Sequence, residues 1–476
     1  MQFETPLDNI EFYADKYDPA SIYAQLIIPG DSDTVPAREM FVPVSSPALM
    51  SYIRKFVLPN CPKKTSEHKL LQEATDYFRL YGCPDTISPK IRVGGGIRDG
   101  FIEYALYNSA QEYVRITPDG WEITTDHEFM FLHPDLNLPQ VSPVETDKSL
   151  LQLMKPYANV TKKDLILLCC WLVQSLSEGP RSALLLMARR GSGKTWLSKA
   201  LTRIISNTRM STSIMPEKHD SFVTALTNSY VVALDNSDEL TRAQSDVLCT
   251  AISGSTVPKR ILYTTNDIGV YKLKNTVIIN GIDIIPAQSD LAERCILLNL
   301  KKITEDSRIS EHELLQRFEA DLPEILGAVF TALSKAMNTI NTIQVNRRPR
   351  MIDSYEEQLA VAEAIGVSAQ DFEDIYFENI DALNKARSEI AIVEAIREYM
   401  NGPLASKSKV KGTVADIYTK IRDNYSGCKS ELPRSPSHFS RKITAEYHTL
   451  QAVGLIVNID PTPADATYIE IIKKSK

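Results

Sequence analysis

One glycine-rich segment near the middle of the chain limits the possible folds more than any other feature. It reads ARRGSGKT at residues 188–195, after the apolar run Ser182–Met187 and before a helical pattern over Trp196–Ile205. A buried strand, a glycine-rich turn and a helix in this order are typical of the loop that holds nucleotide phosphates, here with Ala188 in place of the first glycine. The alternative is a chance match in a strand-to-helix turn, which the flanking elements disfavour.

The residue types in this loop suit phosphate binding. Gly191 and Gly193 allow backbone N–H groups to turn toward a phosphate, and the start of the following helix adds the positive end of its dipole. Lys194 can reach the β- and γ-phosphates, and the hydroxyl of Thr195 can bind Mg²⁺. We therefore expect ATP and Mg²⁺ as cofactors, with the nucleotide held by Ala188, Arg190, Gly191, Ser192, Gly193, Lys194, Thr195 and Trp196.

A second apolar run, Tyr230–Asp235, ends in a carboxylate. The carboxyl ends of neighbouring parallel strands meet beside such a loop, so Asp235 is expected to hold Mg²⁺ through water. The alternative is that this aspartate only forms a turn. Asn236 follows at the place where a glutamate would activate the attacking water, and asparagine cannot accept that proton. Either Asp235, Asp238 or Glu239 assists, or hydrolysis is slow.

Two further polar residues accompany apolar strands. Asn280 ends the run Thr276–Asn280 and can orient the attacking water or contact the γ-phosphate; the alternative is a strand-ending turn. Arg294 lies 14 residues further on and is placed to reach the γ-phosphate of a neighbouring subunit. A guanidinium there accelerates other nucleoside triphosphatases by about 10³–10⁵. The alternative is an ion pair with Asp290 or Glu293. The candidate catalytic residues are Lys194, Asp235, Asn236, Asn280 and Arg294.

Residues 257–275 read as a β-hairpin inserted before the strand that ends at Asn280. Two β-rich runs flank the polar segment Thr264–Asp267, and the hairpin carries four cations, Lys259, Arg260, Lys272 and Lys274. In a ring of subunits such a hairpin would point into the channel and place cations against DNA phosphates. The alternative is a surface hairpin with ordinary solubilising lysines.

The last 90 residues have the pattern of a winged helix. Helical stretches cover Glu389–Met400 and Val414–Asn424, and Ser435 with Pro436 opens a third helix that runs to Gly454. Two strands, 455–459 and 467–472, follow. The third helix would present His438, Arg441 and Lys442, between Ser437 and Ser440, to a DNA groove or backbone. Winged helices also dock proteins, so both readings stay open.

Composition and length set the remaining expectations. The 476 residues carry a net charge of −7, but residues 387–476 hold 14 Lys and Arg against 10 Asp and Glu. A basic tail on an acidic body agrees with a DNA contact in one part of the molecule. We expect an α/β fold with an N-terminal domain (1–145), an ATPase core (146–345), an acidic helical linker (346–386) and the winged helix (387–476). The absence of a signal sequence and of a bilayer-length apolar run favours a cytoplasmic protein that does not contact membranes.

The motifs ARRGSGKT, YVVALDN, KRILYTTND, TVIINGID, SDLAERC and SPSHFSRKI occur in this order. The set resembles the replicative helicase-type ATPases of bacterial mobile elements and phages, which are similar to superfamily 3 and minichromosome-maintenance helicases. The resemblance implies a hexameric AAA+ ring that threads single-stranded DNA. It also implies that Arg294 is the arginine finger, Asn280 the sensor and Arg350 a further phosphate sensor.

The resemblance predicts an ATP-dependent DNA helicase, or a helicase loader, that acts in the replication of a mobile element. Expected partners are single-stranded or forked DNA, further copies of the chain, and a primase or replication initiator. The N-terminal residues show no cluster of catalytic carboxylates, so we expect no primase domain within them. Two alternatives remain: an AAA+ switch that binds DNA without translocating, and a defence or signalling ATPase.

Overall fold

The computed structural model of the chain describes residues 7, 10–16, 21–29, 38–62, 64–83, 85–133, 136–188, 191–235, 237, 240–260, 268–281, 289–404, 408–427, 429–452, 454–460 and 467–473. These residues form two compact units. Unit 1 comprises Met1–Asp238, Asp246–Ile284 and Arg294–Ile375, and unit 2 comprises Glu239–Ser245, Ile285–Glu293 and Tyr376–Lys476. No described helix combines the length and apolar character needed to cross a bilayer.

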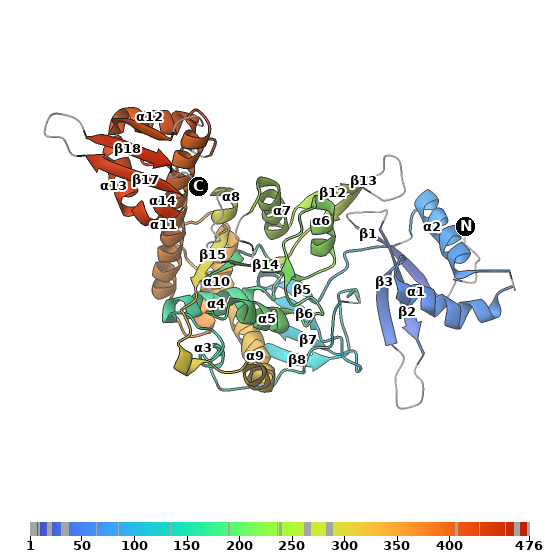
Figure 1. Cartoon of the computed structure of the whole chain (residues 1–476). Coiled ribbons are helices and arrows are strands. Elements are labelled where there is room, and N and C mark those ends of the chain that lie inside the picture. Colours follow the sequence, from blue (N-terminus) through green and yellow to red (C-terminus); the bar gives the residue numbers. More distant parts are fainter. Residues whose placement is uncertain are drawn as a thin grey trace. The chain divides into compact units, whose positions relative to one another are not determined.

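A parallel sheet forms the centre of unit 1, as the long apolar runs predict (Figure 1). Its strands stand in the order β10-β11-β14-β9-β15. Their bounds are β9 Ala183–Met187, β10 Ser213–Ile214, β11 Val231–Asp235, β14 Thr276–Gly281 and β15 Cys295–Asn299. Almost every side chain of β9, β11 and β14 is buried, because helices cover both faces of the sheet. The chain is therefore an α/β protein with a parallel sheet.

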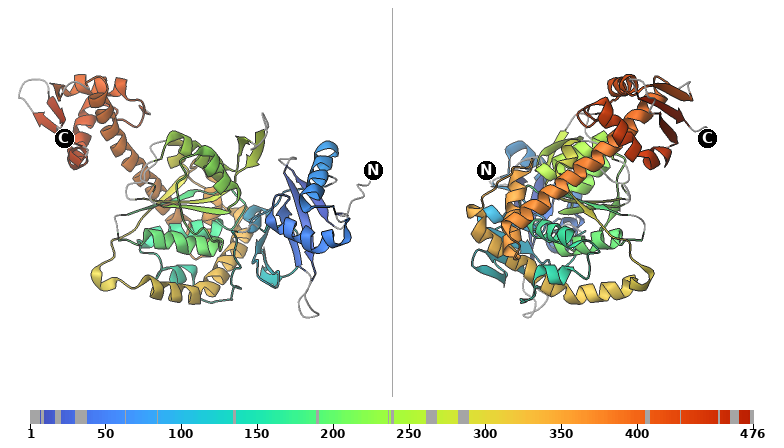
Figure 2. Two further views of the ribbon diagram at one scale, coloured as in Figure 1. Left: turned by 45° about the vertical axis from the view of Figure 1, so that its right-hand side comes forward. Right: turned by 90° about the vertical axis from the view of Figure 1, so that its left-hand side faces the viewer.

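The helices of unit 1 follow the apolar pattern of the sequence. Their bounds are α3 Leu150–Met154, α4 Lys162–Gln174, α5 Lys194–Ile205, α6 His219–Thr227, α7 Arg242–Ser253, α8 Ser289–Ala292, α9 Glu311–Thr339 and α10 Ile352–Ala364, with α8 and the start of α7 assigned to unit 2. Helix α4 is buried from Leu165 to Gln174, where most of its residues are apolar. Helix α9 has 29 residues and continues through Pro323. Figure 2 shows it as one long helix.

Two antiparallel sheets precede the central one. The first has the order β3-β2-β1-β4 and packs on α1 and α2 around a core that contains Phe12, Leu49 and Leu70. The second has the order β5-β6-β7-β8, and its β7–β8 hairpin turns at Pro118-Asp119. The bounds are β1 Glu11–Asp15, β2 Ile22–Ile28, β3 Arg38–Pro43, α1 Pro47–Tyr52, α2 Glu67–Tyr81, β4 Asp85–Ile87, β5 Val93–Gly96, β6 Phe101–Ala105, β7 Tyr113–Thr117 and β8 Gly120–Thr124.

The β5–β8 sheet packs directly on α9. The indole Nε1 of Trp121 in β8 donates to the Thr331 hydroxyl of α9 at 3.0 Å. Further along this helix, the backbone N–H of Val144 donates to the Pro323 carbonyl, which lies 3.0 Å away. A Cβ at Gly327 would lie only 1.9 Å from the Val144 carbonyl oxygen, so only glycine lets the chain pass this close to α9.

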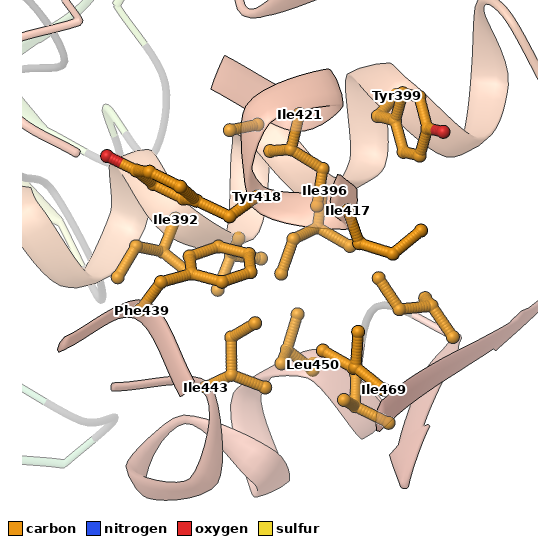
Figure 3. Close-up of a cluster of buried hydrophobic side chains, with 14 of the residues drawn as sticks. Ile392, Ile396, Tyr399, Ile417, Tyr418, Ile421, Phe439, Ile443, Leu450 and Ile469 are labelled. Carbon is orange, nitrogen blue, oxygen red and sulfur yellow. The ribbon is translucent and has the colours of Figure 1, made fainter. Parts of the chain in front are cut away.

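The C-terminal region of unit 2 has a helical side and a three-stranded antiparallel sheet in the order β16-β18-β17. The bounds are α11 Ala369–Asn401, β16 Lys409–Thr413, α12 Val414–Asn424, α13 Pro436–Ala445, α14 Tyr447–Ala452, β17 Leu455–Asp460 and β18 Tyr468–Lys473. Figure 3 shows its core, where Ile396 of α11, Phe439 of α13 and Ile469 of β18 point toward one another. This core gives the region its own hydrophobic centre.

Three details of this region differ from the sequence-based expectation. Strand β16 was missed, because Val410 is its only large apolar residue and no alternation marks it. The third helix breaks at Glu446 into α13 and α14. Helix α11 runs without interruption across the expected boundary at residue 386, because its C-terminal half supplies buried residues to the core from Ala391 onward.

Candidate active site

The glycine-rich turn between β9 and α5 has the backbone geometry that phosphate binding needs. Gly191 has φ +78° and Gly193 has φ +85°, a region that other residues enter only with strain. A Cβ at Gly191 would meet no neighbour within 4 Å, so the backbone conformation and not the available space requires glycine there. Gly193 begins α5 without a side-chain cap. The N–H groups of the first turn therefore face the position that an anion would take.

The side chains around this turn lie in different environments. The Lys194 ammonium contacts the Ala188 carbonyl oxygen across the turn. Thr195 is exposed in the first turn of α5, and Ser192 is buried. The ring of Trp196 packs edge-on against Phe318 of α9, with 5.8 Å between ring centroids. Its indole therefore serves the α5–α9 contact, and Arg190 lies outside the described residues.

The ends of three strands meet beside the turn. Leu234 pairs with Ile279, so Asp235 of β11 and Asn280 of β14 each lie one residue beyond the same pair. Asn280 in turn pairs with Leu186 of β9. Strand β14 therefore lies between β11 and β9, whereas the sequence had suggested that the Asp235 strand neighbours the loop strand directly. Asn236, Asp238 and Glu239 lie outside the described residues.

Asn280 is fully buried and connects the sheet to α5. Its side-chain amide donates to the Ser198 hydroxyl at 2.9 Å, and its backbone carbonyl accepts from the Ser237 N–H at 3.0 Å. Ser198 lies one helical turn after Lys194, so this bond fixes β14 against the first part of α5. Sequence reasoning missed Ser198, because a serine on the buried face of a helix gives no separate signal.

Arg294 lies just before β15, and its carbonyl oxygen accepts from the N–H of Ala183, the first residue of β9. Its guanidinium Nη1 donates to the Ser253 hydroxyl at 2.6 Å. The glycine-rich turn follows the other end of β9. Arg294 and the turn of its own chain therefore lie at opposite ends of the strands, on the two opposite edges of the sheet that these ends form. A strand length of about 16 Å separates them.

The inserted hairpin is present. Strands β12 (Thr256–Arg260) and β13 (Ile268–Lys272) pair antiparallel, with Lys259 opposite Gly269. Lys272 is exposed, while the side chains of Lys259 and Arg260 and all of residues 261–267 lie outside the described part.

Lys274, the fourth of the expected DNA-binding cations, contacts the body of unit 1. Its ammonium donates to the Glu178 carbonyl oxygen at 2.9 Å, and burial lowers its pKa to about 8. The residue follows β13, and its ammonium contacts the loop that precedes β9.

Helix α13 presents one polar face. Ser435 caps it by accepting from the His438 N–H at 3.3 Å. Phe439 and Ile443 are buried in the core, so Ser437 and Arg441 on the other side are exposed. His438 and Lys442 are half-buried at the margins of this face.

Comparison with known proteins finds similarity to a family model and to solved structures. No curated protein matches the chain. Among solved structures, the apo C-terminal region (305–718) of NrS-1 is 13% identical with a TM-score of 0.40, and the match covers 100% of both chains. A JCV helicase with a bound acetamide compound is 17% identical with a TM-score of 0.25, over 50% of this chain and 67% of that one. Residues 148–384, which hold the central sheet and the glycine-rich turn, match the family model of the actinomycete integrative conjugative element replication protein.

Proposed function

We propose that this protein is an ATP-dependent, ring-forming DNA helicase or helicase loader that acts in the replication of a mobile genetic element. The turn at Gly191 and Gly193, which leads from a buried strand into the uncapped start of α5, is the observation that carries the proposal. The match of residues 148–384 to a replication protein family supports the biological setting. Non-translocating switches would use the same turn, so unwinding has to be tested separately.

The residues around the turn fit a nucleotide with Mg²⁺. The exposed hydroxyl of Thr195 and the partly exposed carboxylate of Asp235 are oxygen ligands of the kind that Mg²⁺ prefers. The metal would neutralise charge on the β- and γ-phosphates. The Lys194 ammonium would exchange the Ala188 carbonyl for phosphate oxygens. Asn280, held by Ser198, would orient the attacking water from the end of β14.

The position of Arg294 supports a site shared between subunits. Because it lies at the sheet edge opposite the turn of its own chain, its guanidinium is better placed to serve the nucleotide of another copy. A closed ring satisfies this requirement for every subunit at once. By the resemblance of the motifs, the ring is a hexamer.

Two surfaces would contact single-stranded or forked DNA. The hairpin β12–β13 would place Lys259, Arg260 and Lys272 against the backbone inside the ring. In unit 2, the exposed Arg441 of α13 would contact DNA if the helices and the antiparallel sheet act as a winged helix. A primase or replication initiator is the expected protein partner.

Hydrolysis and unwinding assays with a lysine pair test the proposal. Lys194→Ala should lower ATP hydrolysis by at least about 10²-fold and abolish unwinding of a forked duplex, because it removes a preorganised phosphate contact. Lys199→Ala is the matched control: Lys199 lies on the same helix and pairs with Glu311 at 3.1 Å on the surface. If the wild-type protein hydrolyses ATP without unwinding, it is a switch. If it binds no ATP, the proposal is wrong.

Mixed assemblies test the shared site. Arg294→Ala should lower hydrolysis by about 10³-fold or more with little change in ATP affinity, since the guanidinium acts on the transition state. Addition of this variant to the wild-type protein should reduce activity by more than the fraction added. Full activity of the variant, or a reduction only in proportion, would exclude the finger role.

A further inference from the structure

Two central strands connect the candidate active site to the base of the hairpin. Strand β11 carries Asp235 at its carboxyl end and follows Tyr230 at its other end, and β14 runs from Thr276 to the Asn280 end in the same direction. Strand β13 of the hairpin leads into β14 through Leu273, Lys274 and Asn275. The hairpin therefore joins unit 1 at the sheet edge opposite the glycine-rich turn.

At this edge, one buried guanidinium holds three segments. Arg181 is 2% exposed, and its Nη1 donates to the Ser175 carbonyl at 3.2 Å and to the Tyr230 hydroxyl at 2.6 Å. Its Nη2 donates to the Lys274 carbonyl at 3.0 Å. Tyr230 completes the junction by donating to the same Ser175 carbonyl at 2.7 Å. The rigid, planar guanidinium of Arg181 thus fixes three segments relative to one another: the loop before β9, the start of β11 and the end of the hairpin.

The neutral partners of Arg181 make this junction sensitive to displacement. No carboxylate lies within ion-pair distance of Arg181 in the described part of the chain, and its charge rests on carbonyl and hydroxyl oxygens and on the Tyr230 ring, 4.9 Å away. A shift of any one segment leaves a buried donor or acceptor without its partner, which is unfavourable because the group has already lost its contact with water. Movement at the start of β11 is therefore expected to move the hairpin exit with it.

The second antiparallel sheet reaches the same loop. The Glu178 carboxylate accepts from the Lys90 ammonium at 2.5 Å, and its N–H donates to the Gly95 carbonyl of β5 at 2.8 Å. On the other side, the Glu178 carbonyl accepts from the Lys274 ammonium. The loop Ser175–Arg181 is thus held by the β5–β8 sheet, by β11 and by the hairpin.

We propose that Arg181 and Tyr230 are positioning residues that couple the nucleotide site to the hairpin, by making the start of β11 and the hairpin exit move as one body. This inference rests on the proposed function and deepens it, because it names the path by which nucleotide at one sheet edge sets the position of the DNA-contacting element at the other. The β5–β8 sheet supplies the fixed side of the junction through Glu178.

The chain contains a matched pair for the test. Tyr107 also donates to a backbone carbonyl, that of Leu132 at 2.6 Å, and accepts from the Arg92 N–H at 3.2 Å. The Arg92 guanidinium lies 4.5 Å from its ring centroid, as Arg181 lies over Tyr230. Tyr107→Phe and Tyr230→Phe therefore each remove one hydroxyl that donates to a backbone carbonyl and accepts from an N–H of an arginine, the backbone N–H of Arg92 in one case and the guanidinium of Arg181 in the other. Only Tyr230 contacts the hairpin junction.

The experiment is hydrogen–deuterium exchange on peptides that cover residues 268–281, with and without Mg²⁺ and a non-hydrolysable ATP analogue, in the full-length protein. In the wild type, nucleotide should change the exchange rates of these peptides. Tyr230→Phe should reduce that change by at least about fivefold, the lower range of ordinary coupling between sites. Tyr107→Phe should keep it within about twofold. Calorimetry should show equal nucleotide affinity in all three proteins.

The outcomes separate this inference from the proposed function. A nucleotide-dependent change that persists in Tyr230→Phe, or one lost equally in both variants, overturns the coupling role. The coupling role is also overturned if nucleotide does not change the exchange rates of the hairpin peptides in the wild type. This result does not contradict the proposed ATPase function. If calorimetry finds no nucleotide binding, the proposed function fails and the coupling role falls with it. In a supporting result, Tyr230→Phe also loses DNA stimulation of hydrolysis and retains the basal rate.

Discussion

The β5–β8 sheet and the C-terminal region contrast in how they are held. The sheet belongs to the same unit as the central parallel sheet and is joined to its helices by buried polar contacts. Gln140 donates to the Tyr104 hydroxyl of β6 and to the carbonyls of Arg203 and Ile204 at the end of α5. Arg92, fully buried, reaches the Ser206 hydroxyl and the Asn207 carbonyl. These bonds cap the C-terminal end of the helix that begins at the glycine-rich turn.

The C-terminal region instead packs around its own residues. Its core draws buried side chains from α11, α12, α13, α14 and the sheet, all between Ala391 and Ile471. The comparison teaches that a change in amino-acid composition along the chain does not by itself mark an independently folding domain. Independence depends on whether apolar side chains and buried polar groups find their partners inside the segment or outside it.

Fragments should show the largest difference. Residues 387–476 should fold cooperatively alone, whereas a chain without residues 1–145 should not, because this truncation exposes Phe330 and Leu333 of α9 and strips the end of α5 of Gln140. Circular dichroism melts and one-dimensional NMR spectra would measure both. A cooperative transition and unchanged ATP affinity in the truncated chain would show that the β5–β8 sheet is a separable domain.

A smaller effect should come from one carboxyl at the contact between the β5–β8 sheet and α10. Burial raises the pKa of Glu357 to about 7, against hydrogen bonding from Gln174 and the charge of Arg98. The folded state therefore binds this proton more tightly than the unfolded state. The stability that this proton adds is complete when the pH lies below the pKa of Glu357 in the unfolded chain. It is lost as the pH rises through 7, which lowers the free energy of unfolding by up to about 3 kcal/mol.

Glu357→Gln should remove this loss. The gain in the free energy of unfolding of the variant over the wild type should therefore be larger at pH 8 than at pH 5. Urea unfolding at the two pH values measures the difference. Glu356→Gln is the control, because the neighbouring Glu356 is only half-buried and pairs with Arg98 at 2.6 Å. Equal pH dependence in Glu357→Gln and the wild type would contradict the assignment.

The smallest effect should lie in the C-terminal region. Ser435→Ala removes the side-chain cap of α13 and should destabilise that region by about 1 kcal/mol. Because the region has its own core, ATP hydrolysis without DNA should not change. Thr419→Ala, on the exposed side of α12, is a control with little expected effect. A loss of basal hydrolysis in Ser435→Ala would mean that the two regions are less independent than their cores suggest.

Much of the local structure followed from the sequence. The strand, glycine-rich turn and helix over 182–205 and the capped start of α13 at Ser435 were predicted and are present. These features depend on neighbours within a few residues: glycines that allow positive φ, a serine that caps, and apolar runs of strand length. The local sequence is therefore enough to predict them.

The tertiary structure decided what connects these parts. No pattern in the sequence placed β14 between β11 and β9, joined Asn280 to Ser198, or turned Lys274 inward toward Glu178. The same holds for Arg181, which reads as an ordinary surface cation before a strand but lies buried at the base of the hairpin. Each of these arrangements depends on residues far apart in the chain, and only the packing of the sheet brings them within bonding distance.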